Sequence, residues 1–234
     1  TPAKAWALAH GIPVLQPEKI DDAFRAAFTA YNIDLSIVVA YGSIIPKDVI
    51  DIPTYKTINV HYSLLPKYRG AAPTEAAILA GDTETGVSIQ LMRPKLDTGP
   101  VVAHANLHIG VDETTPELRA RLTETGAALL TWMLPDLFAG KLDPIEQDES
   151  HATHCGKIKK EDAEIHFTDD AETNYRKYRA YKEWPRTYFF HEHHGVRMRV
   201  IITEAHMTDG QFVIDRVLPE GKKEISYEEF VRNY

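Results

Sequence analysis

Three polar side chains stand at the ends of predicted strands, and their chemistry suits acyl transfer. Asn59 and His61 are two residues apart on the predicted strand 56–61, so both side chains leave the same face. Asp97 follows in a loop between two further predicted strands, where Gly99 lets the backbone turn. An amide N–H can hold an oxyanion, an imidazole can move a proton and a carboxylate can orient that imidazole. The same residues also suit a structural role, because an Asp before Thr-Gly is a common turn former.

The elements that would position these residues alternate between strands and helices. Short apolar runs predict strands at residues 12–15, 35–41, 56–61, 87–92 and 100–108, and periodic segments predict helices at 2–10, 18–30, 73–80 and 115–139. The segment 35–41 (LSIVVAY) is dense in β-branched residues, which is typical of a strand covered on both faces. The alternation predicts an α/β domain with a mostly parallel sheet, a fold that binds ligands beyond the carboxyl ends of its strands.

A second, smaller domain is expected after this one. Residues 140–150 are polar and unpatterned, which is typical of a linker. A predicted helix at 170–180 then precedes β-rich segments at 187–190, 196–202 and 211–218. We therefore expect a first domain over residues 1–139, a linker over 140–156 and a small, mostly β domain over 157–234.

The composition excludes several classes of protein. Apolar residues make up 44% and charged residues 26% of the 234 positions, as in ordinary globular chains. No apolar run approaches the roughly 18 residues of a membrane span, and no basic-then-apolar leader begins the chain, so we expect a cytoplasmic protein without a membrane partner. With Cys155 as the single cysteine, no intramolecular disulfide can form. The net charge of −8 argues against a general nucleic-acid coat, although a local basic face can still dock a polyanion.

Longer stretches of the sequence carry a resemblance to a known family. They are INVHYSLLPKYRGAAP at 58–73, AILAGDTETGVSIQLM at 77–92 and LDTGPVVA at 96–103, preceded by VAYG at 39–42. The similarity continues through HATHCGKIKKEDAEIHF at 151–167, Glu-Trp-Pro at 183–185 and LPEGKKEISYEEF at 218–230. Together these segments resemble the folate-dependent formyltransferases.

The resemblance implies a fold and a set of site residues. The fold would be a Rossmann-like formyltransferase domain followed by an abbreviated, OB-like β domain. By motif, Asn59, His61 and Asp97 match the family's catalytic residues, and no metal is implied. The other matches are a folate-binding loop and two pterin-pocket positions, namely Ser63, Leu64, Leu65 and Pro66, and Ile44 and Ile45.

The resemblance also implies a reaction. The formyl donor would be 10-formyltetrahydrofolate, and the acceptor would be the amino group of methionyl initiator tRNA. The Arg-Gly-Ala-Ala-Pro segment at 69–73 favours this branch of the family over its purine-pathway branch. Two alternatives remain, which are a sugar-nucleotide N-formyltransferase and a chain that binds folate or RNA without turnover.

Two departures from the family pattern lead to a structural expectation. The family's first strands, about one βαβ unit of at least roughly 30 residues, have no counterpart here, and the second domain is short between Met207 and Phe212. We expect the sheet to be open beside strand 35–41, with Ile37 and Val39 uncovered. Such an edge favours association with another chain.

Two clusters of side chains have both functional and structural interpretations. His191, His193 and His194 could ligate a metal, but no carboxylate or cysteine spacing completes a site, so we expect a strand-to-turn segment there. The basic part of the second domain consists of Lys157, Lys159, Lys160, Arg176, Lys177, Arg179 and Lys182. Arg176 and Arg179 lie at helical spacing beside tyrosines, which suits RNA contacts and a solvated helix face equally well.

Overall fold

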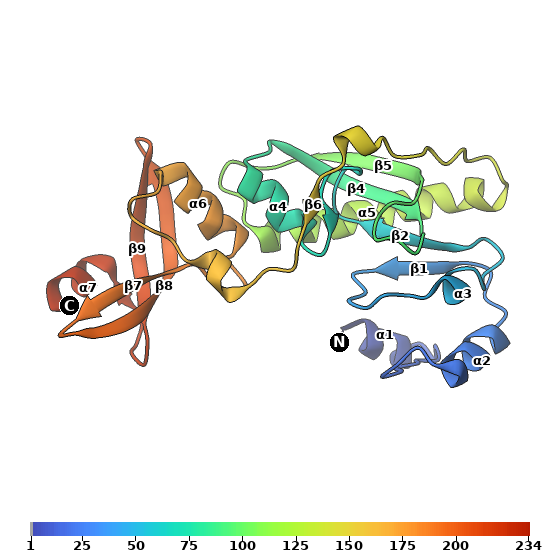
Figure 1. The fold of residues 1–234 in the computed structure, drawn as a ribbon, viewed down its shortest axis with the longest axis horizontal. Coiled ribbons are helices and arrows are strands. Elements are labelled where there is room, and N and C mark those ends of the chain that lie inside the picture. The colour runs from blue at the N-terminus through green and yellow to red at the C-terminus, as the bar shows by residue number, and fades with distance from the viewer. Residues whose placement is uncertain (1) are drawn as a thin grey trace.

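A four-stranded sheet forms the centre of the first part of the chain in the computed structural model, which describes residues 2–234 (Figure 1). The strands β1, β2, β4 and β5 lie side by side in that order and span Ser36–Val39, Thr57–His61, Glu84–Leu91 and Val101–His108. The expected α/β class is confirmed. The sheet is mixed, since β1 and β2 are parallel whereas β4 is antiparallel to both of its neighbours. The turn at residues 92–100 brings β5 back along β4, so these two strands pair antiparallel.

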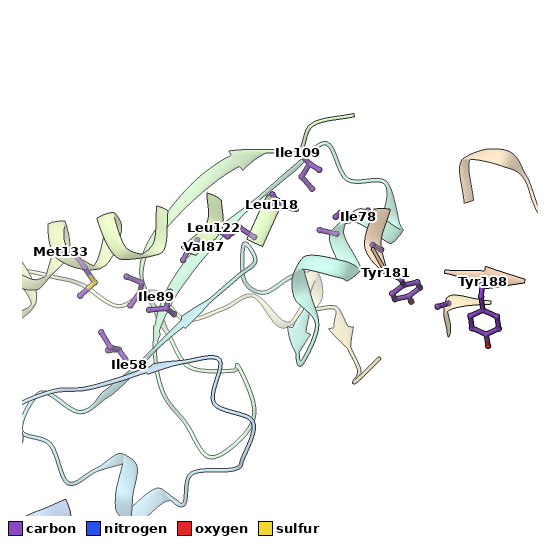
Figure 2. Close-up of a cluster of buried hydrophobic side chains, with 14 residues drawn as sticks. Ile58, Ile78, Val87, Ile89, Ile109, Leu118, Leu122, Met133, Tyr181 and Tyr188 are labelled. Carbon is purple, nitrogen blue, oxygen red and sulfur yellow. The ribbon is translucent and has the colours of Figure 1, made fainter. Parts of the chain in front are cut away.

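One long helix covers a face of this sheet. The helices of this part are α1 (Pro2–Ala9), α2 (Asp22–Ala30), α3 (Lys47–Ile50), α4 (Pro73–Ala80) and α5 (Thr115–Phe138). A capping box between Thr114 and Glu117 begins α5. Figure 2 shows the apolar core that α5 shares with the strands, made of Ile58, Val87, Ile89, Leu118, Leu122 and Met133.

Residues 2–35 lie beside the sheet and contain no buried residue. Neither α1 nor α2 contains a buried residue. The strand expected at residues 12–15 is wrong, because this segment has no strand partner in the described part of the chain, and Ile12 and Leu15 are exposed. A short apolar run becomes a strand only where a neighbour accepts its backbone hydrogen bonds, and none is placed beside it.

The strand β1 forms an open edge of the sheet. Among residues 2–234 it pairs with β2 alone. Ile37 is 41% exposed and Val39 is 49% exposed. The expected open edge with uncovered apolar side chains is therefore present.

The second part of the chain is built on an antiparallel sheet, as expected. Its strands lie in the order β10, β9, β8, β7, and the helix α6 (Ala171–Ala180) precedes them while α7 (Tyr227–Asn233) follows. The strands span Tyr188–His193 (β7), Val196–Thr208 (β8), Gln211–Pro219 (β9) and Ile225–Ser226 (β10). This is one strand fewer than the five of an OB barrel, which fits an abbreviated domain.

The helix α6 packs against the first part of the chain. It lies on α4, and Thr115 at the start of α5 donates a hydrogen bond from its hydroxyl to the carbonyl of Ala180 at 2.8 Å. Ala180, Tyr181 and Tyr188 belong to the same apolar cluster as Ile78 of α4 (Figure 2). The two parts therefore meet in a shared apolar cluster, while the second sheet also has a core cluster of its own that includes Phe189, Val200 and Val217.

The segment expected to be a linker is bound along the first domain rather than free. Ile145 exchanges two backbone hydrogen bonds with Val101, each 2.8 Å long. Further on come the short helical turn η1 (Glu149–His151) and the strand β6 (His154–Cys155), which pairs in parallel with β3 (Arg69–Gly70). We refer to residues 145–155 as the strap. None of the helices within residues 2–234 is long and apolar enough to cross a membrane.

Candidate active site

Strand alternation places the candidate catalytic side chains away from the core. On β2, Ile58 and Val60 belong to the cluster that packs against α5, so Asn59 and His61 leave the opposite face. The antiparallel register continues this pattern onto β4, where Gln90 lies opposite Asn59 and Ser88 lies opposite His61. Two neighbouring strands thus present four polar side chains on one face of the sheet.

Asp97 enters this polar face from the loop between β4 and β5. Its Oδ1 accepts hydrogen bonds from Asn59 Nδ2 at 3.2 Å and from Gln90 Nε2 at 2.8 Å. Its Oδ2 accepts one from the backbone N–H of Gly70 at 2.9 Å. The three residues predicted from the sequence, Asn59, His61 and Asp97, are therefore brought together.

The imidazole of His61 is held in a defined tautomer. Its Nε2 lies 2.9 Å from the carbonyl oxygen of Tyr68. Because a carbonyl can only accept, Nε2 carries the hydrogen and Nδ1 is the nitrogen that can take up a proton. Nδ1 lies 3.7 Å from Oδ1 of Asp97.

Burial and charge act in opposite directions on this imidazole. Burial disfavours the charged imidazolium and lowers the pKa of His61 below its ordinary value, while the Asp97 carboxylate and the Tyr68 carbonyl oppose that shift. The net result favours the neutral ring, which is the form that can accept a proton. Nearby, burial raises the pKa of the Cys155 thiol, and the Asp97 carboxylate adds to this effect. Cys155 therefore remains a neutral neighbour.

Gln90 is a site residue that the sequence analysis missed. Its amide is fully buried, donates to the Asp97 carboxylate and accepts from the N–H of Gly99 at 3.1 Å. It therefore ties together both ends of the turn that carries Asp97. The signal was present in the sequence, since Gln90 is a polar residue in the otherwise apolar end of a predicted strand just before the Leu-Asp-Thr-Gly segment.

A pocket of about 220 Å³ opens above Asn59 and Asp97. Its polar lining includes Asn59, Gln90 and Asp97, and its apolar lining includes Ile44, Ile45, Met92 and Leu96. Ile44 and Ile45, which the resemblance places in a pterin pocket, line this pocket, and pterin binding by them stays a prediction. An apolar slot with a few convergent polar groups is the usual form of a small-molecule site.

The loop Ser63–Pro66 does not line this pocket, and its Leu64 lines a different one. The hydroxyl of Ser63 donates to the carbonyl of Lys67 at 2.5 Å, and the carbonyl of Ser63 accepts from Ser88 at 2.8 Å. Leu65 donates its N–H to the Ser88 hydroxyl at 3.0 Å. These bonds turn the polar groups of the loop inward, and folate binding by Ser63, Leu64, Leu65 and Pro66 stays a prediction.

The basic residues of α6 do not form the RNA-contacting face that their spacing suggested. Tyr175, Tyr178 and Arg179 are buried, and Arg179 donates to the carbonyls of Gly110 and Glu113 at 3.4 and 3.3 Å. Arg179 is bound to the first domain, and Tyr175 and Tyr178 belong to the apolar cluster of the second domain, so this face of the helix is covered. The exposed basic side chains of the group are Lys157, Lys159 and Lys160, which follow the strap.

The histidine cluster has a structural explanation. His191 Nε2 and His193 Nδ1 each lie near the carbonyl oxygen of Tyr234, at 3.1 and 2.8 Å. His194 takes a positive φ of 49° in the turn after β7. The segment is the strand-to-turn element that the sequence favoured.

Comparison with known proteins places the chain in a family. Residues 3–134 match the family model described as formyl transferase, and residues 157–211 match the model described as formyl transferase, C-terminal domain. The chain is 43% identical over 186 residues to "Methionyl-tRNA formyltransferase" of Methylococcus capsulatus, an alignment that covers 79% of this chain and 60% of that relative. It is 40% identical over 223 residues to the Thermus thermophilus protein of the same name, covering 94% of this chain and 72% of that one.

The fold agrees with these sequence matches. The crystal structure of HypX from Aquifex aeolicus in complex with tetrahydrofolic acid superposes with a TM-score of 0.67 at 19% identity, over 88% of this chain and 40% of that one. The chain thus spans about three-fifths of the length of the first curated relative and is matched by family models over most of its own length. It belongs to the formyl transferase family.

Proposed function

We propose that the protein transfers a formyl group from 10-formyltetrahydrofolate to the amino group of methionyl initiator tRNA. The observation that carries the proposal is the cluster of Asn59, His61 and Asp97, in which Asn59 and Asp97 line a largely apolar pocket and His61 lies behind them against Asp97. The names of the Methylococcus and Thermus relatives favour the tRNA reaction over the sugar-nucleotide alternative. A reaction of translation belongs in the cytoplasm, which agrees with the expected location.

The chemistry of the pocket lining suits the pterin end of a folate. A pterin is a flat heterocycle with polar edges, and the slot combines the apolar walls of Ile44 and Ile45 with an amide and carboxylate floor. Tetrahydrofolic acid is the ligand named for the HypX structure. We propose that the formyl group reaches the floor of the pocket, beside Asn59.

Each of the three polar side chains has its own role in the proposed reaction. One N–H of the Asn59 amide is bonded to Asp97, and the second can stabilise the oxyanion that forms when the amine attacks the formyl carbon. His61 accepts a proton from that amine at Nδ1, because Nε2 is bound to Tyr68. Asp97 stabilises the imidazolium through its charge. The proton moves on to the folate nitrogen as the bond from that nitrogen to the formyl carbon breaks.

The acceptor would approach from the side of the second domain. Lys157, Lys159 and Lys160 are exposed at the end of the strap, where they can contact phosphates. Residues 157–234 would then act as the RNA-contacting part of the protein, joined to residues 1–139 by the linker over 140–156.

The test is a transfer assay with two acceptors. The protein is incubated with 10-formyltetrahydrofolate and either methionyl initiator tRNA or an amino-sugar nucleotide, and the formylated product is measured. We expect transfer to the tRNA alone. Transfer to the sugar nucleotide would contradict the proposed tRNA acceptor. Folate binding without any transfer would support the alternative of a protein that binds folate without turnover.

A further inference from the structure

The strap places one side chain directly on the turn that carries Asp97. The Nε2 group of Gln147 donates to the carbonyl of Asp97 at 2.9 Å and to the carbonyl of Gly99 at 2.7 Å. One amide therefore spans the two ends of the Asp97–Gly99 turn. Gln147 is 50 residues away from Asp97 in the chain.

A buried arginine fixes the orientation of this amide. Arg69 donates from Nε and Nη2 to Oε1 of Gln147, at 3.0 and 2.8 Å. The same guanidinium forms two hydrogen bonds to the carboxylate of Glu149, at 3.0 and 2.8 Å. With Oε1 held by Arg69, the amide nitrogen of Gln147 can only point toward the Asp97 turn.

The backbone and the carboxylate of Asp97 are both linked to the same short strand, Arg69–Gly70. The residue after Arg69 is Gly70, whose N–H donates to the Asp97 carboxylate at 2.9 Å. The backbone of Asp97 is thus tied through Gln147 to the Arg69 side chain, while its carboxylate is tied to the next peptide of the same strand. The pair β3–β6 fixes the strap and this strand relative to each other.

The Asp97 turn needs such support. Asp97 has a φ of 52°, in the left-handed region that non-glycine residues seldom adopt. The residues that lead into it, 93–96, are all exposed, so packing does not hold them. A strained residue keeps its conformation only where its surroundings over-determine it.

We propose that Gln147 is a positioning residue that holds the Asp97 carboxylate in place against Asn59 and His61, through hydrogen bonds to the turn and an anchor on Arg69. The proposal rests on the function proposed above for its effect on rate. Its effect on the geometry of Asp97 is independent of the acceptor.

The principal test uses Gln147→Met, which keeps the length and neutral charge of the side chain but lacks the N–H donors. We expect kcat for formyl transfer to fall about 10- to 100-fold, while the KM for the folate donor stays within about twofold, because the loss concerns alignment. The matched control is Ser150→Ala, which removes a strap hydrogen bond to Asp148 that does not reach Asp97. This control should keep the parental kcat.

A second readout does not depend on turnover. The Asp97 carboxylate raises the pKa of His61, so a displaced carboxylate should let that pKa fall further. The imidazole is titrated by NMR in the parental protein, in Gln147→Met and in Ser150→Ala, with His61→Asn used to assign its resonance. We expect a lower pKa in Gln147→Met and an unchanged one in Ser150→Ala.

A second variant separates the hydrogen bonds to the turn from the support that Gln147 gives to Arg69. Gln147→Glu keeps an acceptor for the guanidinium but has no donor for the two carbonyls, so it should also lose kcat although Arg69 keeps its partner. Parental kcat in Gln147→Glu, or an unchanged His61 pKa in Gln147→Met, would overturn the proposal. A parental protein that does not formylate the tRNA, together with a lowered His61 pKa in Gln147→Met, would refute the proposed function and leave the positioning role standing.

Discussion

The imidazole of His61 and the carboxylate of Asp97 face each other across 3.7 Å, measured from Nδ1 to Oδ1, with each side chain only 6% exposed. This separation is longer than a hydrogen bond, so the carboxylate acts on the neutral ring through its charge. When Nδ1 is protonated, the pair becomes a buried ion pair. This geometry suits His61 as a base that takes up a proton and Asp97 as the charge that stabilises the resulting imidazolium.

Replacement of Asn59 should separate catalysis from binding. Asn59→Ala removes the amide that we propose holds the oxyanion, so single-turnover formyl transfer should fall about 10²- to 10³-fold. Folate affinity, measured by titration, should stay nearly unchanged. The exposed Asn106, which bonds to Glu84 far from the pocket, offers a matched control in Asn106→Ala. A parental transfer rate in Asn59→Ala would move the oxyanion site elsewhere.

The pH dependence of the rate should follow His61. Because burial lowers its pKa, the neutral imidazole should persist below the ordinary value of about 6.5, and the acid limb of kcat/KM should lie on the acid side of that value. His61→Asn should be slow and should lack this limb. A limb that persists in this variant would assign the titration to another group.

Removal of the neighbouring charge should shift the same limb. The Asp97 carboxylate raises the pKa of His61, so Asp97→Asn should lower it further and move the acid limb to still lower pH, together with a large loss of rate. The measurement is a full pH profile of both proteins under single-turnover conditions. A limb that moves toward higher pH would contradict the electrostatic role given to Asp97.

Gly70 should be among the least replaceable residues of the chain. A Cβ there would lie 1.9 Å from the carbonyl oxygen of Cys155, and its φ of 128° disfavours any other residue. Gly70→Ala should cost about 2–4 kcal/mol of the free energy of unfolding, measured by chemical denaturation. Gly156→Ala is the control, since no atom lies within 4 Å of the added Cβ there. Equal stability of the two variants would show that the β3–β6 contact is easily displaced.

The open edge at β1 should promote self-association. Within residues 2–234 the outer edge of β1 is unpaired, and such an edge with exposed Ile37 and Val39 can pair with a second copy of this 234-residue chain. Light scattering should show mass rising with concentration, and Val39→Lys should reduce that rise because edge charges oppose pairing. Val196→Lys, which changes a residue 66% exposed on the other sheet, should leave the rise as it is. A parental protein that stays monomeric throughout would contradict this expectation.

The faces on which the side chains of β2 lie could be predicted from the sequence. Alternation along β2 separates Ile58 and Val60 from Asn59 and His61, and this rule holds wherever one face of a strand is buried. The placement of Asp97 near them needed only the strand–turn–strand pattern around it. Whether neighbouring strands run parallel or antiparallel was harder to predict, because the sequence of a strand buried on both faces is similar in the two kinds of sheet.

The strap could not have been found from local patterns. Gln147 lies in a polar stretch without periodicity, and its partners Asp97 and Arg69 are 50 and 78 residues away. The same applies to Arg179, whose helical spacing beside a tyrosine suits a solvated face until the first domain covers it. Side chains that act through distant partners leave no signal in a sequence window.

The packing of α6 on α4 limits how the second domain can be separated from the first or exchanged for that of another protein. Ile78 on one side and Tyr181 on the other belong to a single apolar cluster, so the two halves are not independent modules. A second domain grafted from another protein would have to bring side chains that fit Ile78 and accept the Thr115 hydroxyl as Ala180 does. Exchange between relatives should therefore succeed only when α4, the start of α5 and α6 are exchanged together.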